Sequence, residues 1–397
     1  MYTPDMQTYI KRTQENEIKK LMSYFPVVAI IGPRQCGKST LAKHILASIN
    51  DSIYLDLEDI DDWQQLSDAK QFFVTHQNRT ICIDEVQRKP ELFTTIRSIV
   101  DTYPNIRILL LGSASPDLLR QTSETLAGRI AYTELTPFTI KELNNEAYDL
   151  YAHWVRGGFP DSFLAPDTSL SFHWRMNFLR TFVEKDLPQL GIHIPSLQLQ
   201  KFLRLISHYN GQVINYAKMA QALEVSNKTL KSYIQLFEQT FLLRTLQPYE
   251  TNTKKRLVKS PKLYVRDTGI LHSLLKIADW SELLGSPTMG NSWESFVLEN
   301  IWSEFEHWEK NFYRTSSGTE IDLVLQKGTN RPILIECKSS TNAHLSKGFW
   351  QTLEDLDPQF VWVMTPLSGV RQLRDKVFMG GMESFFEHCQ SYGLVST

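Results

Sequence analysis

Long hydrophobic runs are missing from this 397-residue sequence. Its longest apolar stretches fall far short of the roughly 20 residues that a helix needs to cross a bilayer. The first residues, MYTPDMQTYIKRTQENEIKKLM, are polar and lack the apolar segment of an export signal. We therefore expect a cytoplasmic protein without a membrane partner.

Cysteine is also scarce, and the four cysteines are isolated from one another. No pair of them has CxxC spacing, so the sequence predicts neither disulfides nor structural zinc. Low-complexity segments and repeats are absent as well, and 42% hydrophobic with 22% charged residues is typical of a folded protein. At about 150 residues per domain, the chain has room for two or three domains. The cysteines are Cys36, Cys82, Cys337 and Cys389.

Charge is nearly balanced overall but uneven along the chain. The net charge is −2, whereas residues 191–270 hold twelve Lys and Arg against four Asp and Glu, a local charge of +8. The remainder therefore carries −10. A basic middle segment in a chain of this kind favours a partner with phosphate groups.

A phosphate-binding loop is indicated by FPVVAIIGPRQCGKST, which has the pattern GxxxxGK(S/T). The apolar run Val27 to Ile31 suits a parallel strand buried on both faces, and a helix-like stretch follows the loop. Backbone N–H groups at such a helix start bind phosphates. We expect Lys38 to reach the β- and γ-phosphates of ATP and Ser39 to bind Mg²⁺. The full predicted nucleotide-binding set is Gly32, Arg34, Gly37, Lys38, Ser39 and Thr40.

An acidic pair follows a second apolar strand in RTICIDEVQ. We expect Asp84 to hold Mg²⁺ and Glu85 to orient and deprotonate the attacking water, which predicts hydrolysis of ATP to ADP and phosphate. A third strand, IRILLLG, ends at SAS, where Ser113 could contact the γ-phosphate or the water as a polar sensor.

Several motifs together resemble a widespread group of prokaryotic AAA+-superfamily ATPases that carry a C-terminal domain formerly of unknown function. They are YIKR, GPRQCGKSTL, IDEVQRKPELF, LAGRI, RGGFP and EKDLPQL, in this order. The resemblance covers nearly the whole chain and implies a five-stranded parallel core followed by a helical lid. The group often has TGS at the sensor, and the sequence around Ser113 departs from this wording. Arg156 of RGGFP is either a second sensor or a structural arginine.

In oligomeric ATPases of the AAA+ type, an arginine just before the fifth strand enters the neighbouring subunit's site. Arg129 of ETLAGRI stands there, before the probable strand IAYTEL, and Arg120 competes with it. Such a residue contributes about 10³–10⁵ in rate. The alternative is a surface arginine at a helix end. The resemblance thus predicts a homo-oligomeric ring, for example a hexamer.

The basic middle segment has the pattern of a winged helix. INYAKMAQALEVSNKTLKSYIQLFEQTFLLRTLQPY predicts helix, turn, helix and strand, and YETNTKKRLVKSPKLYV predicts the wing. Winged helices also serve as docking or lid elements, but the local charge of +8 favours phosphate contacts with DNA over reading of sequence. The predicted DNA contacts are Asn227, Lys228, Lys231, Lys254, Lys255, Arg256 and Lys259.

The C-terminal segment has the pattern D-x(13)-E-x-K in Asp322, Glu336 and Lys338, as in PD-(D/E)xK nucleases. Residues Gly328 to Asn330 predict a hairpin that brings the face of Glu320 and Asp322 to that of Glu336 and Lys338. Carboxylates there would bind Mg²⁺ and Lys338 would position water. Glu294 and Glu299 of the preceding helix compete as a further ligand, and Glu294 is preferred because it shares the apolar stripe. An ordinary solvated strand end is the alternative.

The predicted architecture is α/β: a P-loop AAA+ core (1–145), a helical lid (146–195), a winged helix (196–270) and a PD-(D/E)xK nuclease-like domain (271–397). The leading functional hypothesis is an ATP-hydrolysing ring that remodels or translocates on duplex or branched DNA. The alternatives are an ATP-dependent switch in transcription, toxin or defence regulation, and an ATP-gated, Mg²⁺-dependent endonuclease. The residues leave open whether the C-terminal site cuts DNA or only holds it.

Overall fold

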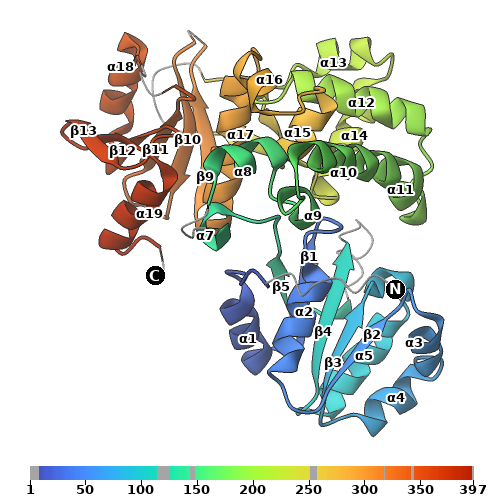
Figure 1. Ribbon diagram of the computed structural model, residues 1–397. Coiled ribbons are helices and arrows are strands. Elements are labelled where there is room, and N and C mark those ends of the chain that lie inside the picture. The colour runs from blue at the N-terminus through green and yellow to red at the C-terminus, as the bar shows by residue number, and fades with distance from the viewer. Residues whose placement is uncertain are drawn as a thin grey trace. The chain divides into compact units, whose positions relative to one another are not determined.

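The computed structural model describes residues 9–113, 125–143, 148–250, 257–316, 318–340 and 344–395 (Figure 1). Contacts divide the chain into two compact units. The first comprises Met1–Leu143 with the short segment Gln239–Phe241, and the second comprises Asn144–Glu238 and Leu242–Thr397. Within the described residues, no helix combines the length and the apolar character that a membrane span requires.

The first unit is built on a parallel five-stranded sheet in the order β2-β3-β4-β1-β5. Its central strands are apolar on both sides because helices cover both faces, and Ile96 and Ile99 of α5 pack in one core cluster with Ile81 of β3. This sheet confirms the predicted P-loop core. Its strands are β1 (Val27–Gly32), β2 (Ser52–Asp56), β3 (Thr80–Asp84), β4 (Arg107–Ser113) and β5 (Ile130–Glu134). Its helices include α1 (Glu15–Tyr24), α2 (Lys38–Ala47), α3 (Ile60–Gln65), α4 (Ala69–Thr75), η1 (Val86–Arg88), α5 (Leu92–Thr102) and α7 (Ile140–Leu143).

The second unit contains a nine-stranded mixed sheet in the order β13-β14-β12-β11-β10-β9-β7-β8-β6. Strands β10 and β11 form the antiparallel hairpin that the sequence predicts, with Val324 opposite Leu334. Strand β12 then runs parallel to β11, as expected when a helix connects two strands. The strands are β6 (Gln212–Val213), β7 (Leu243–Pro248), β8 (Lys262–Val265), β9 (Glu309–Arg314), β10 (Glu320–Gln326), β11 (Ile333–Cys337), β12 (Phe360–Met364), β13 (Val370–Arg374) and β14 (Val377–Gly380).

Helices of the second unit form one group before β7, interrupted only by the short strand β6, and a second group that lies between or after the later strands (Figure 1). The first group is α8 (Leu150–Arg156), α9 (Pro160–Phe163), α10 (Thr168–Thr181), the π-helical turn η2 (Phe182–Asp186), α11 (Leu187–Gln189), α12 (Ser196–His208), α13 (Tyr216–Ala222) and α14 (Asn227–Gln239). The second group is α15 (Thr268–Leu274), α16 (Trp280–Leu284), α17 (Met289–Glu304), α18 (Lys347–Leu356) and α19 (Met382–Ser391).

The sheet of the second unit passes through two of the predicted domains. Strand β7, from the predicted winged helix, pairs in parallel with β9 of the C-terminal segment, so 196–270 and 271–397 share one sheet. The main division follows Leu143, near the predicted end of the P-loop core at residue 145. The finer division into lid, winged helix and nuclease-like domain stays a prediction.

Candidate functional site

The GxxxxGKS loop joins β1 to α2 at the carboxyl edge of the first sheet. Gly37 caps α2 in the left-handed region, with φ 99°, which suits glycine. Lys38 folds back over the loop, and its Nζ donates to the carbonyl oxygens of Gly32 at 3.1 Å and Pro33 at 2.8 Å. Any Cβ on Gly32 would lie 2.2 Å from the carbonyl oxygen of Leu135, so only glycine fits there.

The other predicted loop residues lie around this turn. Arg34 is half-buried in the loop, and Thr40 is exposed in the first turn of α2. Sequence reasoning gave no role to Arg12, which holds the loop through a hydrogen bond to its backbone. Its buried guanidinium donates to the carbonyl oxygens of Cys36 at 2.8 Å and Thr136 at 2.5 Å, and pairs with Glu142 at 2.9 Å.

Asp84 lies at the end of β3 and faces the loop. Its Oδ2 accepts hydrogen bonds from Ser39 Oγ at 2.6 Å and from the hydroxyl of Tyr54 at 2.5 Å, while Oδ1 accepts from the backbone N–H of Glu85 at 2.9 Å. Tyr54 comes from the neighbouring strand β2, which sequence reasoning did not single out. Burial and the Asp84 carboxylate raise the pKa of Tyr54, so its hydroxyl stays a donor.

Glu85 follows Asp84 in the left-handed backbone region, with φ 53°. Its carboxylate accepts a hydrogen bond from Gln87 Nε2. Burial raises the pKa of Glu85, although the Lys38 ammonium opposes the effect. A carboxylate with a raised pKa is a better proton acceptor, as a general base requires.

These residues fit a nucleotide with Mg²⁺. Mg²⁺ prefers oxygen ligands and keeps several waters, and the Ser39 hydroxyl beside the Asp84 carboxylate supplies the oxygens that a P-loop site uses. The bent loop and the first turn of α2 supply backbone N–H donors for phosphates. Lys38 adds a positive charge at the same edge.

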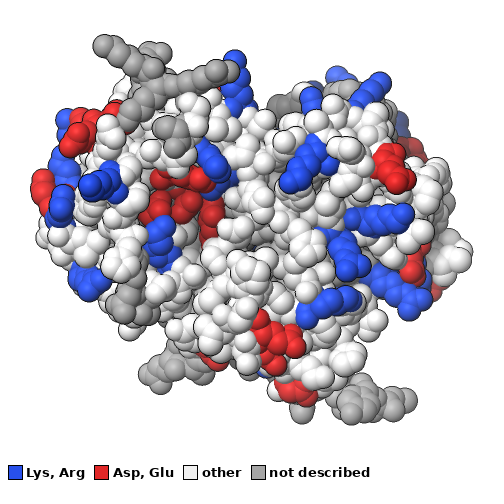
Figure 2. All heavy atoms as spheres, turned by 90° about the horizontal axis from the view of Figure 1, so that it is seen from above, with Lys and Arg blue, Asp and Glu red and all other residues white. Residues whose placement is uncertain are grey.

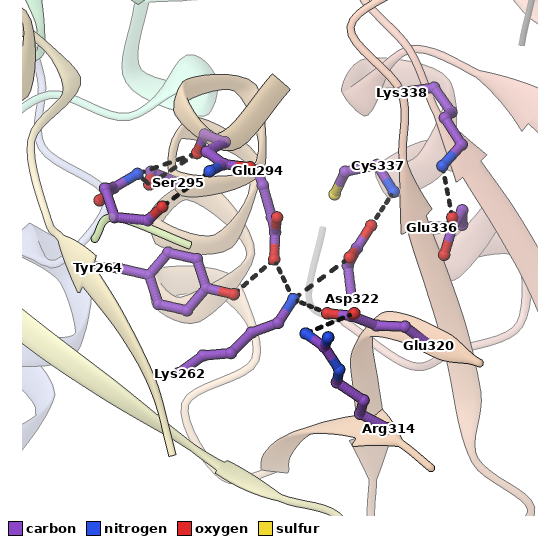
Figure 3. Close-up of polar contacts among 12 residues, drawn as sticks. Lys262, Tyr264, Glu294, Ser295, Arg314, Glu320, Asp322, Glu336, Cys337 and Lys338 are labelled. Carbon is purple, nitrogen blue, oxygen red and sulfur yellow. Dashed lines mark hydrogen bonds and ion pairs between the residues drawn. The ribbon is translucent and has the colours of Figure 1, made fainter. Parts of the chain in front are cut away.

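A second candidate site lies in the other unit, where three carboxylates surround a lysine (Figure 3). Lys262 of β8 has a side chain only 1% exposed, and its Nζ lies 2.7 Å from Glu294 Oε1, 2.5 Å from Glu320 Oε1 and 3.4 Å from Asp322 Oδ1. The Tyr264 hydroxyl donates to Glu294 at 2.5 Å. We call Lys262, Glu294, Glu320 and Asp322 the Lys262 cluster.

Glu336 and Lys338 lie beside this cluster on and just after β11 (Figure 3). Lys338 Nζ donates to Glu336 Oε1 at 2.6 Å, and Asp322 Oδ2 accepts the backbone N–H of Cys337 at 2.8 Å. The other oxygen of Glu336 is buried without a hydrogen-bond partner. Figure 2 shows acidic side chains gathered in a hollow over the C-terminal strands, with Lys and Arg around it.

Two local features turn these side chains toward one another. The register between β9 and β10 shifts between Ile321 and Val324, and such a bulge re-aims the side chains beside it. Glu294 projects from the buried face of α17, whereas Glu299 pairs with Arg244 at 2.5 Å and Arg266 at 2.9 Å. The structure thus brings Glu294, Asp322 and Glu336 into one region and leaves Glu299 in a separate ion-pair group.

Charge decides what this region can hold. Burial alone would lower the pKa of Lys262, but the surrounding carboxylates, Glu294 first, outweigh it and hold the pKa well above its usual value. Burial raises the pKa of Glu336 to about 8, and the Asp322 charge adds to the effect. Lys262 is therefore a permanent cation among the carboxylates.

The donor set does not fit a divalent metal held by Glu294, Asp322 and Glu336. The ammonium of Lys262 already contacts two of these three carboxylates. Among the residues that the structure describes, no group of three or more His, Cys, Asp and Glu side chains is arranged to hold a metal ion.

Three family profiles match this chain, and together they cover both candidate sites. The profile of the family described as "AAA domain" matches residues 24–144, which include the P-loop and Asp84. Two profiles described as domains of unknown function match residues 147–281 (DUF8612) and 289–378 (DUF4143). An uncharacterized protein of Mycobacterium tuberculosis is 36% identical over 347 residues, which are 87% of this chain and 78% of that protein, and one of Mycobacterium bovis matches equally.

The chain belongs to a family of P-loop, AAA-type ATPases. An uncharacterized protein of Haemophilus influenzae is more distant, at 24% identity over 65% of this ATPase and 72% of that protein. Among solved structures, a Walker-type ATPase of Pyrococcus abyssi has 15% identity and a TM-score of 0.48, covering 67% of this chain and 96% of that one.

The predicted sensor and arginine finger of the ATPase lie at opposite ends of its parallel sheet. Ser113 ends β4 directly beside Gly32 in the register, at the P-loop edge, and its side chain is outside the described residues. Arg129 precedes β5 at the opposite end of the strands, where it forms a bidentate ion pair with Asp101 at 2.5 and 2.9 Å. By the rise of the strands, about 20 Å separate it from its own P-loop, which is more than its side chain can span. Arg120 lies outside the described residues.

Arg156 of RGGFP has a structural role in the ATPase. Its guanidinium donates to the carbonyl oxygens of Phe163 at 3.3 Å and Ala165 at 2.9 Å, and to the Thr168 hydroxyl at 3.0 Å. These bonds tie α8 to the turn before α10. The geometry therefore agrees with the structural alternative rather than with a second sensor.

The predicted DNA contacts that the structure describes are exposed. Asn227 and Lys228 open α14, and Lys231 follows one turn later with its ammonium 5.1 Å from the ring centre of Tyr216. Lys259 is exposed just before β8. Lys254, Lys255 and Arg256 lie outside the described residues.

Proposed function

We propose that this ATPase hydrolyses ATP with Mg²⁺, binds DNA through its basic middle segment, and works as a homo-oligomer. The observation that carries the proposal is the contact of Ser39 with Asp84 at the P-loop, with Glu85 next to it. The family supports the nucleotide part, and the charge distribution supports the choice of DNA.

The proposed chemistry divides among residues of the chain. Lys38 binds the β- and γ-phosphates, and the backbone N–H groups of the loop orient them. Ser39 and Asp84 hold Mg²⁺, which supplies charge stabilisation at the phosphates. Glu85 orients the attacking water and accepts its proton, for which the raised pKa of this carboxylate is suited.

The DNA part rests on element order and charge. Helices α13 and α14 are separated by a short turn, and β7 and β8 pair antiparallel after them, the order of a winged helix. The exposed N-terminal end of α14, which carries Asn227 and Lys228, is the part of such a helix that meets the major groove. The local charge of +8 favours phosphate contacts.

The oligomer part rests on Arg129. An arginine that stabilises transition-state charge in trans must be exposed and must lie away from its own nucleotide. Arg129 has 31% of its side chain exposed and pairs with Asp101. Assembly would exchange this exposed ion pair for a contact with the neighbour's phosphates. Arg129→Ala and Glu85→Gln should each turn over slowly alone, and mixing the two proteins should raise turnover if the arginine acts in trans.

The test of the proposal is ATPase rate and oligomer size with and without duplex, branched and single-stranded DNA. We expect DNA to stimulate turnover, and Glu85→Gln to reduce it by about 10²–10⁴-fold while nucleotide still binds. Lys228→Glu with Lys231→Glu should lower the salt dependence of DNA binding by about one ion per lysine. Lys70→Glu, an exposed lysine on α4, is the control for charge reversal. Turnover that ignores saturating DNA while oligomer size follows nucleotide would instead identify an ATP-dependent switch.

A further inference from the structure

The Lys262 cluster is unusual because a cation is built into the chain where a metal-dependent nuclease would hold Mg²⁺. The carboxylates on β10 and β11 lie in the pattern D-x(13)-E-x-K, yet Lys262 comes from β8, more than 50 residues earlier in the chain than Asp322. Three carboxylate oxygens lie 2.5 to 3.4 Å from its Nζ. This is the kind of oxygen shell that a hard divalent cation requires.

We propose that the ammonium of Lys262 takes the place of the divalent cation, so that the C-terminal site binds no catalytic metal and does not cut DNA. A second cation among the same oxygens would meet the repulsion of an ammonium only a few ångströms away. The cluster instead links β8 to α17 and β10 through ion pairs, which join the basic middle segment to the C-terminal sheet.

Burial makes this arrangement durable. The Lys262 side chain is 1% exposed, and its Nζ lies over the ring of Phe312, 5.5 Å from the ring centre. A buried lysine that lost its carboxylates would be strongly unfavourable, and buried carboxylates that lost the lysine would be equally so. An incoming metal ion would therefore have to displace a buried, ion-paired side chain.

Geometry also indicates what removal of the lysine would create. Glu336 has one buried oxygen without a hydrogen-bond partner, and Glu294 and Asp322 would each lose the contact that Lys262 makes. With the ammonium gone, the oxygens of Glu294, Glu320 and Asp322 that now contact Nζ would have to draw together around an added ion, since they are not arranged to hold one as they stand. Oxygen ligands of this kind are the ones that Mn²⁺ and Mg²⁺ prefer. The variant is therefore expected to need a metal that the natural protein does not.

The experiment is thermal unfolding of the full chain, followed by tryptophan fluorescence, with and without millimolar Mn²⁺ and without nucleotide. Ser39→Ala is included in every protein to weaken metal binding at the P-loop. In the protein that keeps Lys262, the unfolding temperature should not change when Mn²⁺ is added. Lys262→Ser should lower the unfolding temperature, and Mn²⁺ should raise it again. The affinity of this variant for Mn²⁺ should be at least about a hundredfold tighter than that of the protein with Lys262.

Two controls make the result specific. Lys310→Ser removes another buried lysine, on β9, whose Nζ donates to the carbonyl oxygens of Trp308 at 2.9 Å and Glu306 at 3.3 Å. It should destabilise the protein without rescue by Mn²⁺. Adding Asp322→Asn to Lys262→Ser should abolish the rescue.

The proposal is overturned if Mn²⁺ raises the unfolding temperature of the protein that keeps Lys262 and if this effect disappears when Asp322→Asn is added. It is equally overturned by Mn²⁺-dependent cleavage of duplex, branched or single-stranded DNA that disappears in Glu336→Gln. Both measurements use protein with Lys262 in place, so they decide the question even if Lys262→Ser does not fold. Neither depends on ATP turnover, and a failure here leaves the proposed ATPase and DNA-binding function untouched.

Discussion

Unfolding of the second unit should depend on pH through His272, which is fully buried on α15. Its Nδ1 lies 3.0 Å from the carbonyl oxygen of Val155, which can only accept, so Nδ1 carries the proton. Its Nε2 lies 2.7 Å from Ser292 Oγ, which in turn accepts from Trp154 Nε1 at 2.9 Å. Ser292 must therefore donate to Nε2, and the network holds a neutral imidazole.

The size of the effect follows from the pKa of His272. Burial lowers this pKa from 6.5 to about 3, and the Arg175 charge acts in the same direction. Because the folded pKa lies below the unfolded one, the unfolded chain binds more protons as pH falls, and stability is lost from pH 6.5 downward toward pH 3. At pH 5 the loss amounts to about 2 kcal/mol in the free energy of unfolding.

Denaturant unfolding of the natural protein and of His272→Asn, each at about pH 7.5 and pH 5, measures this loss. Tryptophan fluorescence reports on the second unit, since Trp63 is the only one of the nine tryptophans within residues 1–143. The fall in stability between the two pH values should be about 2 kcal/mol larger with His272 present. Carboxyl groups with raised pKa, such as Glu294 and Glu336, act in the opposite direction but cancel in the comparison. His193→Asn, at an exposed position, should change nothing, and equal pH slopes for the natural protein and the His272→Asn variant would refute the reasoning.

Two further substitutions test packing around the functional elements. Gly157→Ala would place Cβ 2.2 Å from Asp267 Oδ1 at a φ of 75°, so it should lower the stability of the second unit by more than about 4 kcal/mol. The control is Gly191→Ala, at φ 76° with nothing within 4 Å, which should cost only about 1 kcal/mol. Similar losses for the two variants in denaturant unfolding would contradict the role of the close approach to Asp267. Arg12→Met would leave the fully buried Glu142 carboxylate without its guanidinium, so we expect a loss of about 3–5 kcal/mol and weaker binding of a fluorescent ATP analogue. Adding Glu142→Gln should recover part of that stability, and a double variant no more stable than Arg12→Met would argue against an uncompensated charge.

The nucleotide site could be predicted from short stretches of sequence because each part of it is local. An apolar run buried on both faces, a glycine-rich loop and a helix follow one another along a single short segment, and parallel strands bring their carboxyl ends to one edge. The end of β3 therefore had to place Asp84 near Ser39. Tyr54 could not be predicted as part of the site, because a single tyrosine in a strand belongs to no recognisable motif. Only the pairing of β2 with β3 brings its hydroxyl to Asp84.

The C-terminal carboxylates were predictable in part. Strand periodicity and the hairpin placed Asp322 opposite the Glu336 strand, and helical spacing favoured Glu294 over Glu299. Lys262 had no such signal. It was one basic residue in a basic segment, and nothing local indicates that its side chain is buried among acids.

The chain's order of residues is enough to determine that it binds nucleotide by a P-loop, because that chemistry depends on contiguous backbone and on strand ends that a parallel sheet must bring together. The surroundings of the C-terminal acids depend on tertiary structure. Strand β7 pairs with β8 on one side and with β9 of the C-terminal segment on the other, and this shared sheet places an ammonium among carboxylates that the sequence pattern assigns to a metal. Long-range pairing of this kind leaves no periodic trace, since it depends on packing between segments rather than on spacing within one.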